Sequence, residues 1–310
     1  MRVLITGVGG FIGYHLTEFL LSKGCTVVGT ELGECHNGIH EKISVMQCDV
    51  IDSEKVKSII RELDPDVIFH LAAQSYPDVS WAKPNLTMKV NVEGTVNLFE
   101  AIRQLKVDPL VFIPGSGAEY GVSDKDAPLE EDYRLLPVSP YGVSKVMQDL
   151  LGYQYYKNYS IRCIRVRLFN STGPKRLKDV CSDFTRRAVM IEKGLTDNVL
   201  KVGNLETKRA ITDVRDVVNA LWMLIEKGKP GDVYNICTSN VYKMKDVLDK
   251  VVSITGISPT ISQDQSLMRV SDEPVLIGDT AKLKQHTGWE AEIPLDDTLK
   301  DMVEQWRLTL

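Results

Sequence analysis

Short runs of consecutive apolar residues alternate with longer amphipathic stretches along the first half of the chain. The runs are rich in valine, isoleucine and leucine and have no polar face, as expected of strands that are covered on both sides. They predict strands at Arg2–Thr6, Thr26–Thr30, Ile43–Gln47, Val67–His70, Leu110–Pro114 and Ile161–Val166. The stretches between them predict helices at Phe11–Lys23, Ser53–Leu63, Pro84–Lys106 and Pro140–Asn158. This alternation predicts an α/β protein with a doubly wound parallel sheet and right-handed crossovers.

The pattern becomes less regular after Leu168. It predicts helices at Asp179–Glu192, Val214–Glu226, Lys243–Ser253 and Leu295–Trp306, and a strand at Asp232–Ile236. We therefore expect a larger domain over residues 1–168, with segments near 205–240 returning to it. Most of residues 169–310 should form a smaller α/β lobe that binds substrate.

The composition is that of an ordinary globular protein. The chain has 310 residues, of which 43% are hydrophobic and 25% charged, so it can bury a full core without metals or disulfides. Its net charge of −5 argues against a general nucleic-acid-binding protein, which needs a basic face. No apolar run approaches the roughly 18 residues of a membrane span, and the apolar start is too short for a signal peptide. We therefore expect a cytoplasmic protein whose six scattered cysteines are free thiols.

A glycine-rich loop follows the first predicted strand and opens the first predicted helix. Three of its glycines, Gly7, Gly10 and Gly13, form a G-x-x-G-x-x-G pattern. Glycine permits a tight turn and a close approach of the backbone to a pyrophosphate, and the helix N-terminus offers free N–H groups to the phosphates. Because a strand precedes the loop and a helix follows it, a Rossmann-type dinucleotide site is favoured over a purely structural turn. The residues expected to bind the cofactor are Gly7, Gly10, Phe11, Ile12 and Gly13.

Glu31 ends the second predicted strand, where an acid can accept hydrogen bonds from the adenosine ribose hydroxyls. Its carboxylate would also repel a 2′-phosphate, so NAD(H) is the expected cofactor and NADP(H) the alternative. A solvated loop acid is the other interpretation of Glu31. Asp49 and Val50 follow the third strand and are placed to meet the adenine.

Tyr141 and Lys145 lie four residues apart near the start of a predicted helix, so their side chains share one face. A lysine cation should lower the pKa of the tyrosine, which could then exchange a proton with a sugar hydroxyl or ketone. Ser116 is the first hydroxyl beyond the fifth strand and could hydrogen-bond the reacting oxygen. A turn serine is its alternative interpretation.

Several motifs occur together in one order: Thr6–Gly13, His70–Ala73, Asn91–Thr95, Ser116, and the pair Tyr141 and Lys145. Their arrangement, with Tyr141 25 positions after Ser116, resembles the extended short-chain dehydrogenase/reductases, also called the NAD-dependent epimerase/dehydratase family. The resemblance covers essentially the whole chain. It implies a Rossmann-type fold, an NAD-type cofactor that also contacts Leu71, Ala72 and Ala73, and a nucleotide-sugar substrate that contacts Gln74 and Ser75. It also implies a homodimer through the helices predicted at 84–106 and 140–158, although their apolar positions could equally be core.

The second half resembles one branch of this family, the GDP-mannose dehydratases and GDP-4-keto-6-deoxymannose reductases. The similar segments are Lys201–Asp216, Arg269–Pro274 and Leu276–Asp279. The branch implies that Arg209 meets the substrate diphosphate and that Arg269 and Asp272 meet the nucleoside, roles that suit a guanidinium and a carboxylate. It further implies substrate contacts by Asn170 and Arg186. A GDP-sugar is therefore the favoured substrate.

Residue 118 departs from the dehydratase pattern. The 4,6-dehydratases carry a glutamate there that removes a proton from the sugar, whereas this chain has Ala118. Glu119 is adjacent, but neighbouring residues of an extended segment point to opposite sides. We therefore favour reduction of the 4-keto group of a GDP-4-keto-6-deoxyhexose, with a GDP- or UDP-hexose 4-epimerase that retains NAD as the alternative. A 4,6-dehydratase and a non-catalytic dinucleotide sensor are less favoured, and Ala210 in place of an acid leaves the sugar open.

Two groups of residues could suggest other chemistry. Cys35, His36 and His40 are close in sequence, but the turn signal Asn37-Gly38 favours a surface loop, and no metal is expected. His70 ends the fourth predicted strand, where a packed, hydrogen-bonded histidine is favoured over a catalytic base.

Overall fold

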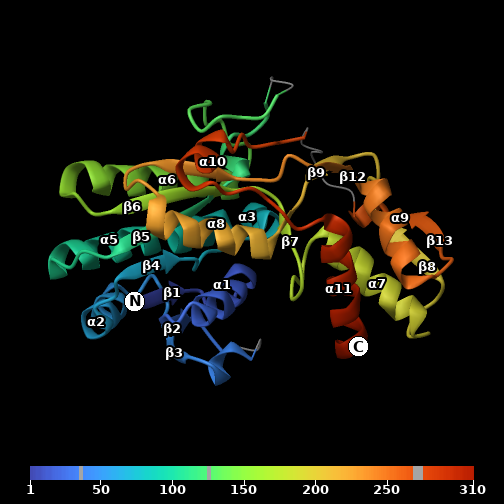
Figure 1. Ribbon diagram of the computed structural model, residues 1–310, viewed down its shortest axis with the longest axis horizontal. Helices are drawn as coiled ribbons and strands as arrows, with labels where there is room; N and C mark the ends of the chain where they lie inside the picture. Colours follow the sequence, from blue (N-terminus) through green and yellow to red (C-terminus); the bar gives the residue numbers. More distant parts are fainter. Residues whose placement is uncertain (35–37, 124–126, 268–274) are drawn as a thin grey trace.

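A seven-stranded, entirely parallel sheet forms the centre of the computed structural model, which describes residues 1–34, 38–123, 127–267 and 275–310 (Figure 1). Strand order reverses between β1 and β4, and open α/β sheets bind ligands beyond the strand carboxyl ends at such a point. The strands are, in spatial order, β11 (Val233–Ile236), β6 (Cys163–Leu168), β5 (Leu110–Ser116), β4 (Val67–His70), β1 (Arg2–Thr6), β2 (Thr26–Glu31) and β3 (Ser44–Gln47).

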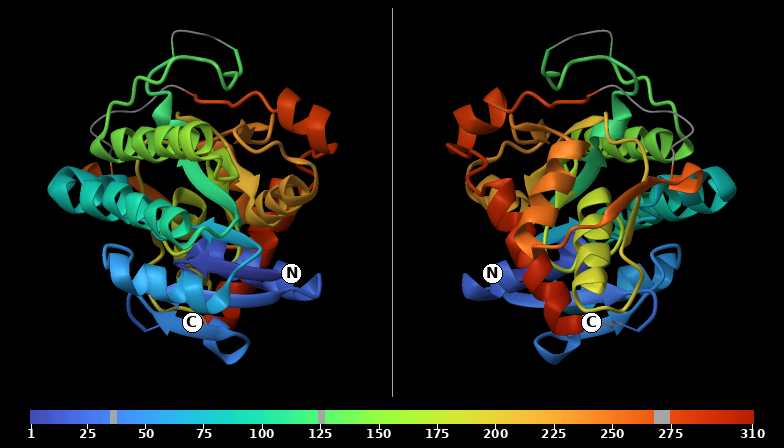
Figure 2. Two further views of the ribbon diagram at one scale, coloured as in Figure 1. Left: turned by 90° about the vertical axis from the view of Figure 1, so that its left-hand side faces the viewer. Right: turned by 90° about the vertical axis from the view of Figure 1, so that its right-hand side faces the viewer.

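Helices cover both faces of this sheet (Figure 2). On one face α2 (Ser53–Leu63), α5 (Gly94–Leu105) and α6 (Pro140–Tyr159) pack against alternate strand residues such as Leu4. On the other face α1 (Phe11–Ser22), α8 (Val214–Lys227) and α10 (Ala281–Thr287) pack against Val3 and Ile5. Successive side chains of β1 therefore enter two separate cores, which explains why Val3, Leu4 and Ile5 are all apolar and every position after Arg2 is buried. The predicted doubly wound α/β fold is confirmed.

A second lobe lies at one end of the sheet, on the right of Figure 1. Its core includes Phe184, Leu200, Val247 and Leu299. The helices are α7 (Val180–Glu192), α9 (Met244–Thr255) and α11 (Leu295–Thr309). The strand pairs are β8 (Val199–Val202) with β13 (Thr260–Gln263), β9 (Lys208–Ala210) with β12 (Val241–Lys243), and β7 (Ser171–Thr172) with β10 (Thr212–Asp213).

The helix predicted at 84–106 is interrupted. It consists of α4 (Pro84–Met88), a π-helical segment (Lys89–Glu93) and α5. The buried side chain of Asn91 lies in the π-helical segment and makes hydrogen bonds to neighbouring elements, which is a common setting for such segments. Gly94 follows because a Cβ there would lie 2.7 Å from Cγ2 of Val50.

The remaining differences concern short elements. The strand predicted at 161–166 is observed two residues later as β6, and the six-residue helix α3 (Pro77–Ala82) has no counterpart among the predicted elements. Single 3₁₀ turns occur at Ile39–Glu41, Gly117–Glu119 and Gln265–Leu267. Among the described residues, no helix combines the length and apolar character that crossing a membrane requires.

Candidate active site

The glycine loop connects β1 to α1 and packs directly against the segment that follows β4. Gly7 has a φ of +70°, and a Cβ there would lie 2.8 Å from the Cα of Ala72. A Cβ on Gly13 would lie 2.7 Å from the carbonyl oxygens of Gly7 and Val8. Gly10 is the N-cap of α1 and offers no capping side chain. A loop that admits no side chain at Gly7 or Gly13, in front of a helix start without a side-chain cap, fits the pyrophosphate of a dinucleotide.

Glu31 does not project freely into solvent. Its Oε2 accepts a 2.7 Å hydrogen bond from the N–H of Gly9, and its Oε1 accepts one of 3.2 Å from the N–H of Leu32. The carboxylate thus lies against the glycine loop at the carboxyl end of β2. This position is compatible with a ribose contact, which remains a prediction.

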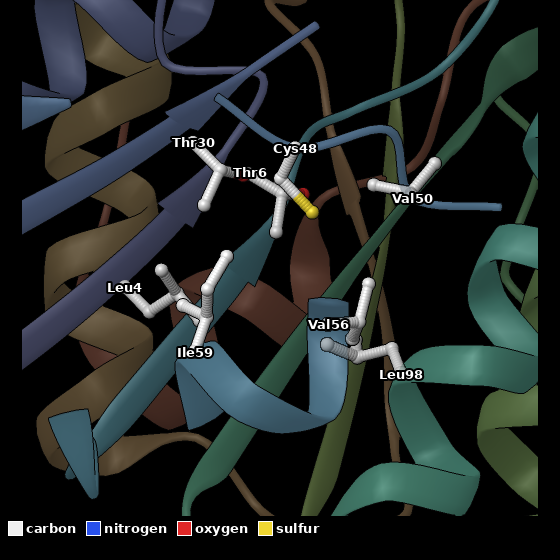
Figure 3. Close-up of a pocket in the computed structure, with 8 residues that line it drawn as sticks. All are labelled: Leu4, Thr6, Thr30, Cys48, Val50, Val56, Ile59 and Leu98. Atoms are coloured by element: carbon white, nitrogen blue, oxygen red, sulfur yellow. The ribbon is translucent and has the colours of Figure 1, made fainter. Parts of the chain in front are cut away.

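The other adenosine candidates surround the carboxyl ends of β3 and β4. Asp49 stabilises its own turn, because its Oδ1 accepts a 3.1 Å hydrogen bond from the N–H of Ile51. Among the residues that follow β4 (Leu71, Ala72 and Ala73), Ala72 donates its N–H to Oγ1 of Thr6 at 3.1 Å. Val50 is buried and lines a small, mainly aliphatic pocket beneath these strand ends, together with Leu4, Thr6, Thr30, Cys48, Val56, Ile59 and Leu98 (Figure 3).

His70 is a packed, neutral residue. Its side chain is fully buried, and its Nδ1 lies 2.9 Å from Oγ1 of Thr6. Burial lowers its pKa to about 3, and the charge of Lys145 acts in the same direction. The interpretation of His70 as a hydrogen-bonded core histidine is confirmed.

Gln74 holds its loop in place and is itself held by Asn91. The N–H of Gln74 donates to Oδ1 of Asn91 at 2.7 Å, and Nδ2 of Asn91 donates to the carbonyl of Gln74 and to Oγ of Ser144. The side chain of Gln74 also donates to Oγ1 of Thr87, whereas Ser75 is exposed. Asn91 therefore joins the loop after β4 to α6, a role that its place in the Asn91–Thr95 motif did not reveal.

The three catalytic candidates come together at the carboxyl end of β5. Ser116 is the last residue of β5, and its hydroxyl is hydrogen-bonded to the phenol of Tyr141 in the first turn of α6. Nζ of Lys145 lies 5.9 Å from the centre of the Tyr141 ring. The lysine donates hydrogen bonds to the carbonyl of Pro114 (2.9 Å) and to Oε1 of Gln148 (2.8 Å).

Burial shifts the pKa values of Tyr141 and Lys145 in the directions that favour the neutral form of each group. Burial raises the pKa of Tyr141 to about 12, while the hydrogen bond from Ser116 opposes that change. Burial lowers the pKa of Lys145 to about 8. The expectation that Lys145 lowers the pKa of Tyr141 is therefore wrong, because desolvation dominates and the ammonium is bonded to Pro114 and Gln148. A tyrosine that stays protonated at neutral pH is ready to donate its proton.

Ala118 and Glu119 lie on opposite sides of the turn after β5. Ala118 is partly exposed, whereas Glu119 is fully buried. Oε1 of Glu119 accepts a 2.6 Å hydrogen bond from the N–H of Ser116, and Oε2 lies 3.1 Å from Nε of Arg167. Burial and the charge of Asp149 raise the pKa of Glu119, and Arg167 opposes them. Glu119 thus points away from Ala118 as expected, although Gly117–Glu119 form a 3₁₀ turn and not the extended segment from which that expectation was derived.

A basic segment after β7 was not predicted to contribute to the site. Cζ of Arg176 lies 4.8 Å from the ring centre of Phe11, the first residue of α1, and its charge acts on the pKa of Tyr141. Nζ of Lys175 lies 4.1 Å from the ring centre of Tyr14 in the same helix. The signal in the sequence was the Lys-Arg-Leu-Lys run after Gly173-Pro174.

The substrate candidates lie on separate elements of the second half. Asn170 is exposed just after β6, and its carbonyl accepts a 2.9 Å hydrogen bond from the N–H of Thr212. Arg209 lies in β9 and Arg186 on the exposed side of α7. Some residues named in the sequence analysis lie outside the described residues: Cys35, His36 and Asn37, and the segment Arg269–Pro274 with Asp272.

Comparison with known proteins identifies the family. Residues 4–302 match the family model described as GDP-mannose 4,6 dehydratase. The chain belongs to this family. The GDP-6-deoxy-D-mannose reductase of Pseudomonas aeruginosa is 28% identical, over 98% of this chain and 97% of its own.

Solved structures agree with this assignment. The structure of RMD from Pseudomonas aeruginosa complexed with NADPH has a TM-score of 0.88 at 28% identity and covers 100% of this chain and 99% of its own. The UDP-glucose 4-epimerase of Thermotoga maritima with UDP-glucose has a TM-score of 0.89 at 27% identity, with coverage of 100% and 99%. The resemblance expected from the sequence motifs is therefore confirmed.

Proposed function

We propose that this protein is an NAD(P)H-dependent reductase that converts the 4-keto group of a GDP-4-keto-6-deoxyhexose to a hydroxyl. The relative named GDP-6-deoxy-D-mannose reductase, which aligns over nearly the full length of both chains, supports this substrate class. The observation that carries the choice of reaction is the orientation of Glu119, whose carboxylate is buried on Ser116 and Arg167. With Ala118 at the dehydratase position, the open side of the turn offers hydroxyls for proton transfer and no carboxylate from these two residues.

The glycine loop and its neighbours would hold the dinucleotide. Backbone of Gly7, Gly10 and Gly13 and the start of α1, with Phe11 and Ile12, would meet the pyrophosphate. Glu31 would accept the ribose hydroxyls and disfavour a 2′-phosphate, so we propose that NAD(H) is preferred. The RMD structure contains NADPH, which makes NADP(H) the alternative. The adenine and the nicotinamide half would be contacted by Asp49, Val50, Leu71, Ala72, Ala73, Tyr141 and Lys145.

The reduced nicotinamide supplies a hydride when it is bound, and the protein must supply a proton. The Ser116 hydroxyl donates to the Tyr141 phenol in the free protein, and once it rotates away from the phenol both hydroxyls can donate to one substrate oxygen. Tyr141, with its pKa of about 12, holds its proton at neutral pH and gives it up as negative charge develops on that oxygen. Lys145, whose ammonium is held by Pro114 and Gln148, would orient the nicotinamide ribose.

The proposed substrate contacts combine both lobes. Gln74 and Ser75 follow β4, Asn170 follows β6, and Arg186 and Arg209 belong to the second lobe. Arg209 would pair with the diphosphate, and Arg269 and Asp272 would meet the nucleoside.

The test is to supply GDP-4-keto-6-deoxymannose with NADH or NADPH and to follow the absorbance of the reduced nicotinamide. We expect one equivalent of the reduced nicotinamide to be consumed for each sugar reduced.

A 4-epimerase is the second candidate, because the Thermotoga maritima epimerase has a TM-score of 0.89. Both reactions would use the same Ser116, Tyr141 and Lys145, so retention of the cofactor is what distinguishes them. Purification with tightly bound NAD, and interconversion of nucleotide sugars without added cofactor, would support the epimerase. Dinucleotide binding without turnover of either substrate would indicate a sensor.

We also propose a cytoplasmic homodimer formed through α6. Val143, Met147 and Leu150 are spaced three or four residues apart on this helix, and each residue is between 38% and 52% exposed. A large apolar stripe on one helix face is typical of a contact with a second copy.

A further inference from the structure

Two arginines face the same side of a central strand. Arg165 and Arg167 lie two residues apart in β6, between β5 and β11, so their side chains emerge on one face. Only 10% and 4% of these side chains are exposed. A cation in such a place is very unfavourable unless it is paired and fully hydrogen-bonded. These arginines therefore need partners that neutralise and hydrogen-bond them.

Arg167 contacts two elements that carry catalytic candidates. Its Nε lies 3.1 Å from Oε2 of Glu119, in the turn after β5, and 3.0 Å from Oδ2 of Asp149 on α6. Its Nη1 donates to the hydroxyl of Tyr120 at 2.9 Å and to the carbonyl of Glu131 at 2.7 Å. One guanidinium thus joins the Ser116 turn to the helix that carries Tyr141.

The second oxygen of each carboxylate extends this connection. Oε1 of Glu119 accepts a 2.6 Å hydrogen bond from the N–H of Ser116 itself. Oδ1 of Asp149 lies 2.5 Å from Nη1 of Arg165. Asp149 follows Tyr141 by eight residues and Lys145 by four, so all three lie along one side of α6. A continuous series of contacts therefore runs from the backbone of Ser116 to the helix face that bears Tyr141.

Gly115 makes room for this arrangement. A Cβ on Gly115 would lie 2.0 Å from Oε1 of Glu119. The carboxylate consequently occupies the space that any other residue of β5 at this position would fill. The Gly-Ser sequence at the end of β5 serves the placement of the Glu119 side chain as well as the turn.

We propose that Glu119, Arg167 and Asp149 are positioning residues that fix the Ser116 hydroxyl against the Tyr141 hydroxyl. The idea rests on the proposed function, in which these two hydroxyls share the keto oxygen. Positioning of donors to within a fraction of an ångström decides how strongly they stabilise a developing charge. None of the three positioning residues needs to touch the substrate.

The test is a double-mutant cycle on reductase turnover. Glu119→Gln keeps an oxygen for the N–H of Ser116 but presents an amide NH₂ donor to Nε of Arg167 in place of the acceptor oxygen Oε2. We expect kcat to fall about tenfold, within the range of couplings between contacting residues. The KM and the affinity for NADH should stay unchanged. In a Ser116→Ala background the same substitution should reduce kcat by less than about twofold, because the hydroxyl that it positions is already absent.

A matched control removes a buried carboxylate elsewhere. Oδ2 of Asp216 accepts backbone hydrogen bonds from Glu292 (3.1 Å) and Ile293 (3.0 Å). Asp216→Asn should lower the unfolding temperature and leave kcat unchanged. If Glu119→Gln does not fold, judged by thermal unfolding and NADH binding, Asp149→Asn is measured in the same cycle from the side of α6.

The outcomes distinguish a failure of the positioning role from a failure of the proposed function of Ser116. Equal fold losses from Glu119→Gln in the wild-type and Ser116→Ala backgrounds would overturn the positioning role, as would unchanged kcat in the wild-type background. If Ser116→Ala itself leaves kcat unchanged, the proposed function of Ser116 is wrong and the positioning role falls with it.

Discussion

Lys145 should destabilise the folded protein at neutral pH, and we expect Lys145→Met to reveal this. The ammonium is buried, and its pKa falls from 10.5 to about 8 because of that burial. Each unit of pKa corresponds to about 1.36 kcal/mol, so keeping the lysine charged below pH 8 costs folding on the order of 3 kcal/mol.

The methionine substitution removes this cost and two hydrogen bonds. The acceptors on Pro114 and Gln148 lose their donor, a loss on the order of 1–2 kcal/mol. At pH 7 the variant should therefore be more stable than the wild type by about 1–2 kcal/mol. Methionine is close to the lysine stem in length, so packing should change little.

The pH dependence has a definite sign. Between pH 8 and 10.5 the unfolded chain still holds the lysine proton and the folded chain does not. The free energy of unfolding of the wild type should therefore rise with pH relative to the variant, by about 3 kcal/mol over this interval. The variant, which is more stable at pH 7, should therefore become less stable than the wild type as the pH rises.

Urea unfolding at several pH values between 7 and 10, followed by tryptophan fluorescence, measures this difference. Lys300→Met, at an exposed position of α11, controls for the chemistry of the substitution. A difference between wild type and Lys145→Met that stays constant with pH would refute the reasoning. So would a variant that is less stable than the wild type at pH 7 and gains stability relative to it as the pH rises.

Four further outcomes are expected. Tyr141→Phe should lower turnover by about a hundredfold to ten-thousandfold while NADH still binds, and near-normal turnover would place the chemistry on another residue. Glu31→Ala should narrow the preference for NAD(H) over NADP(H), measured by titration of both; tighter NADP(H) binding by the wild type would remove the ribose role. GDP-mannose incubated with NAD should yield no 4-keto-6-deoxy sugar, because residue 118 is alanine; detection of that product would point to a base that we have not identified. Met147→Lys should shift the mass in solution from dimer toward monomer, since a charge would be buried in the proposed interface, and a monomeric wild type would contradict the dimer.

The central sheet and the glycine loop were predictable because they depend on local patterns. Uninterrupted apolar runs identify strands covered on both faces, and the three glycines lie where backbone must approach backbone, as the contact between Gly7 and Ala72 shows. The pairing of Ser116 with Tyr141 followed from family spacing.

The buried charges could not be predicted from local sequence. Arg165 and Arg167 alternate with apolar residues, a pattern that normally indicates a strand with one solvated face. Their burial depends on Glu119 and Asp149, which lie 48 and 18 residues from Arg167. The pKa of Tyr141 was misjudged for a similar reason, because the spacing to Lys145 was visible and the degree of desolvation was not. Two-residue strands such as β7 and β10 exist only through their pairing.

The π-helical segment before α5 has a consequence for insertions and deletions. A π turn contains one residue more than an α turn, and each residue advances an α-helix by about 100°. Loss of a single residue between Lys89 and Glu93 would regularise this turn and rotate the whole of α5 about its axis. Leu98 and Ile102, now in the core under the sheet, would turn toward solvent. The number of residues in this segment, more than the identity of most of them, thus determines which face of α5 packs against the sheet.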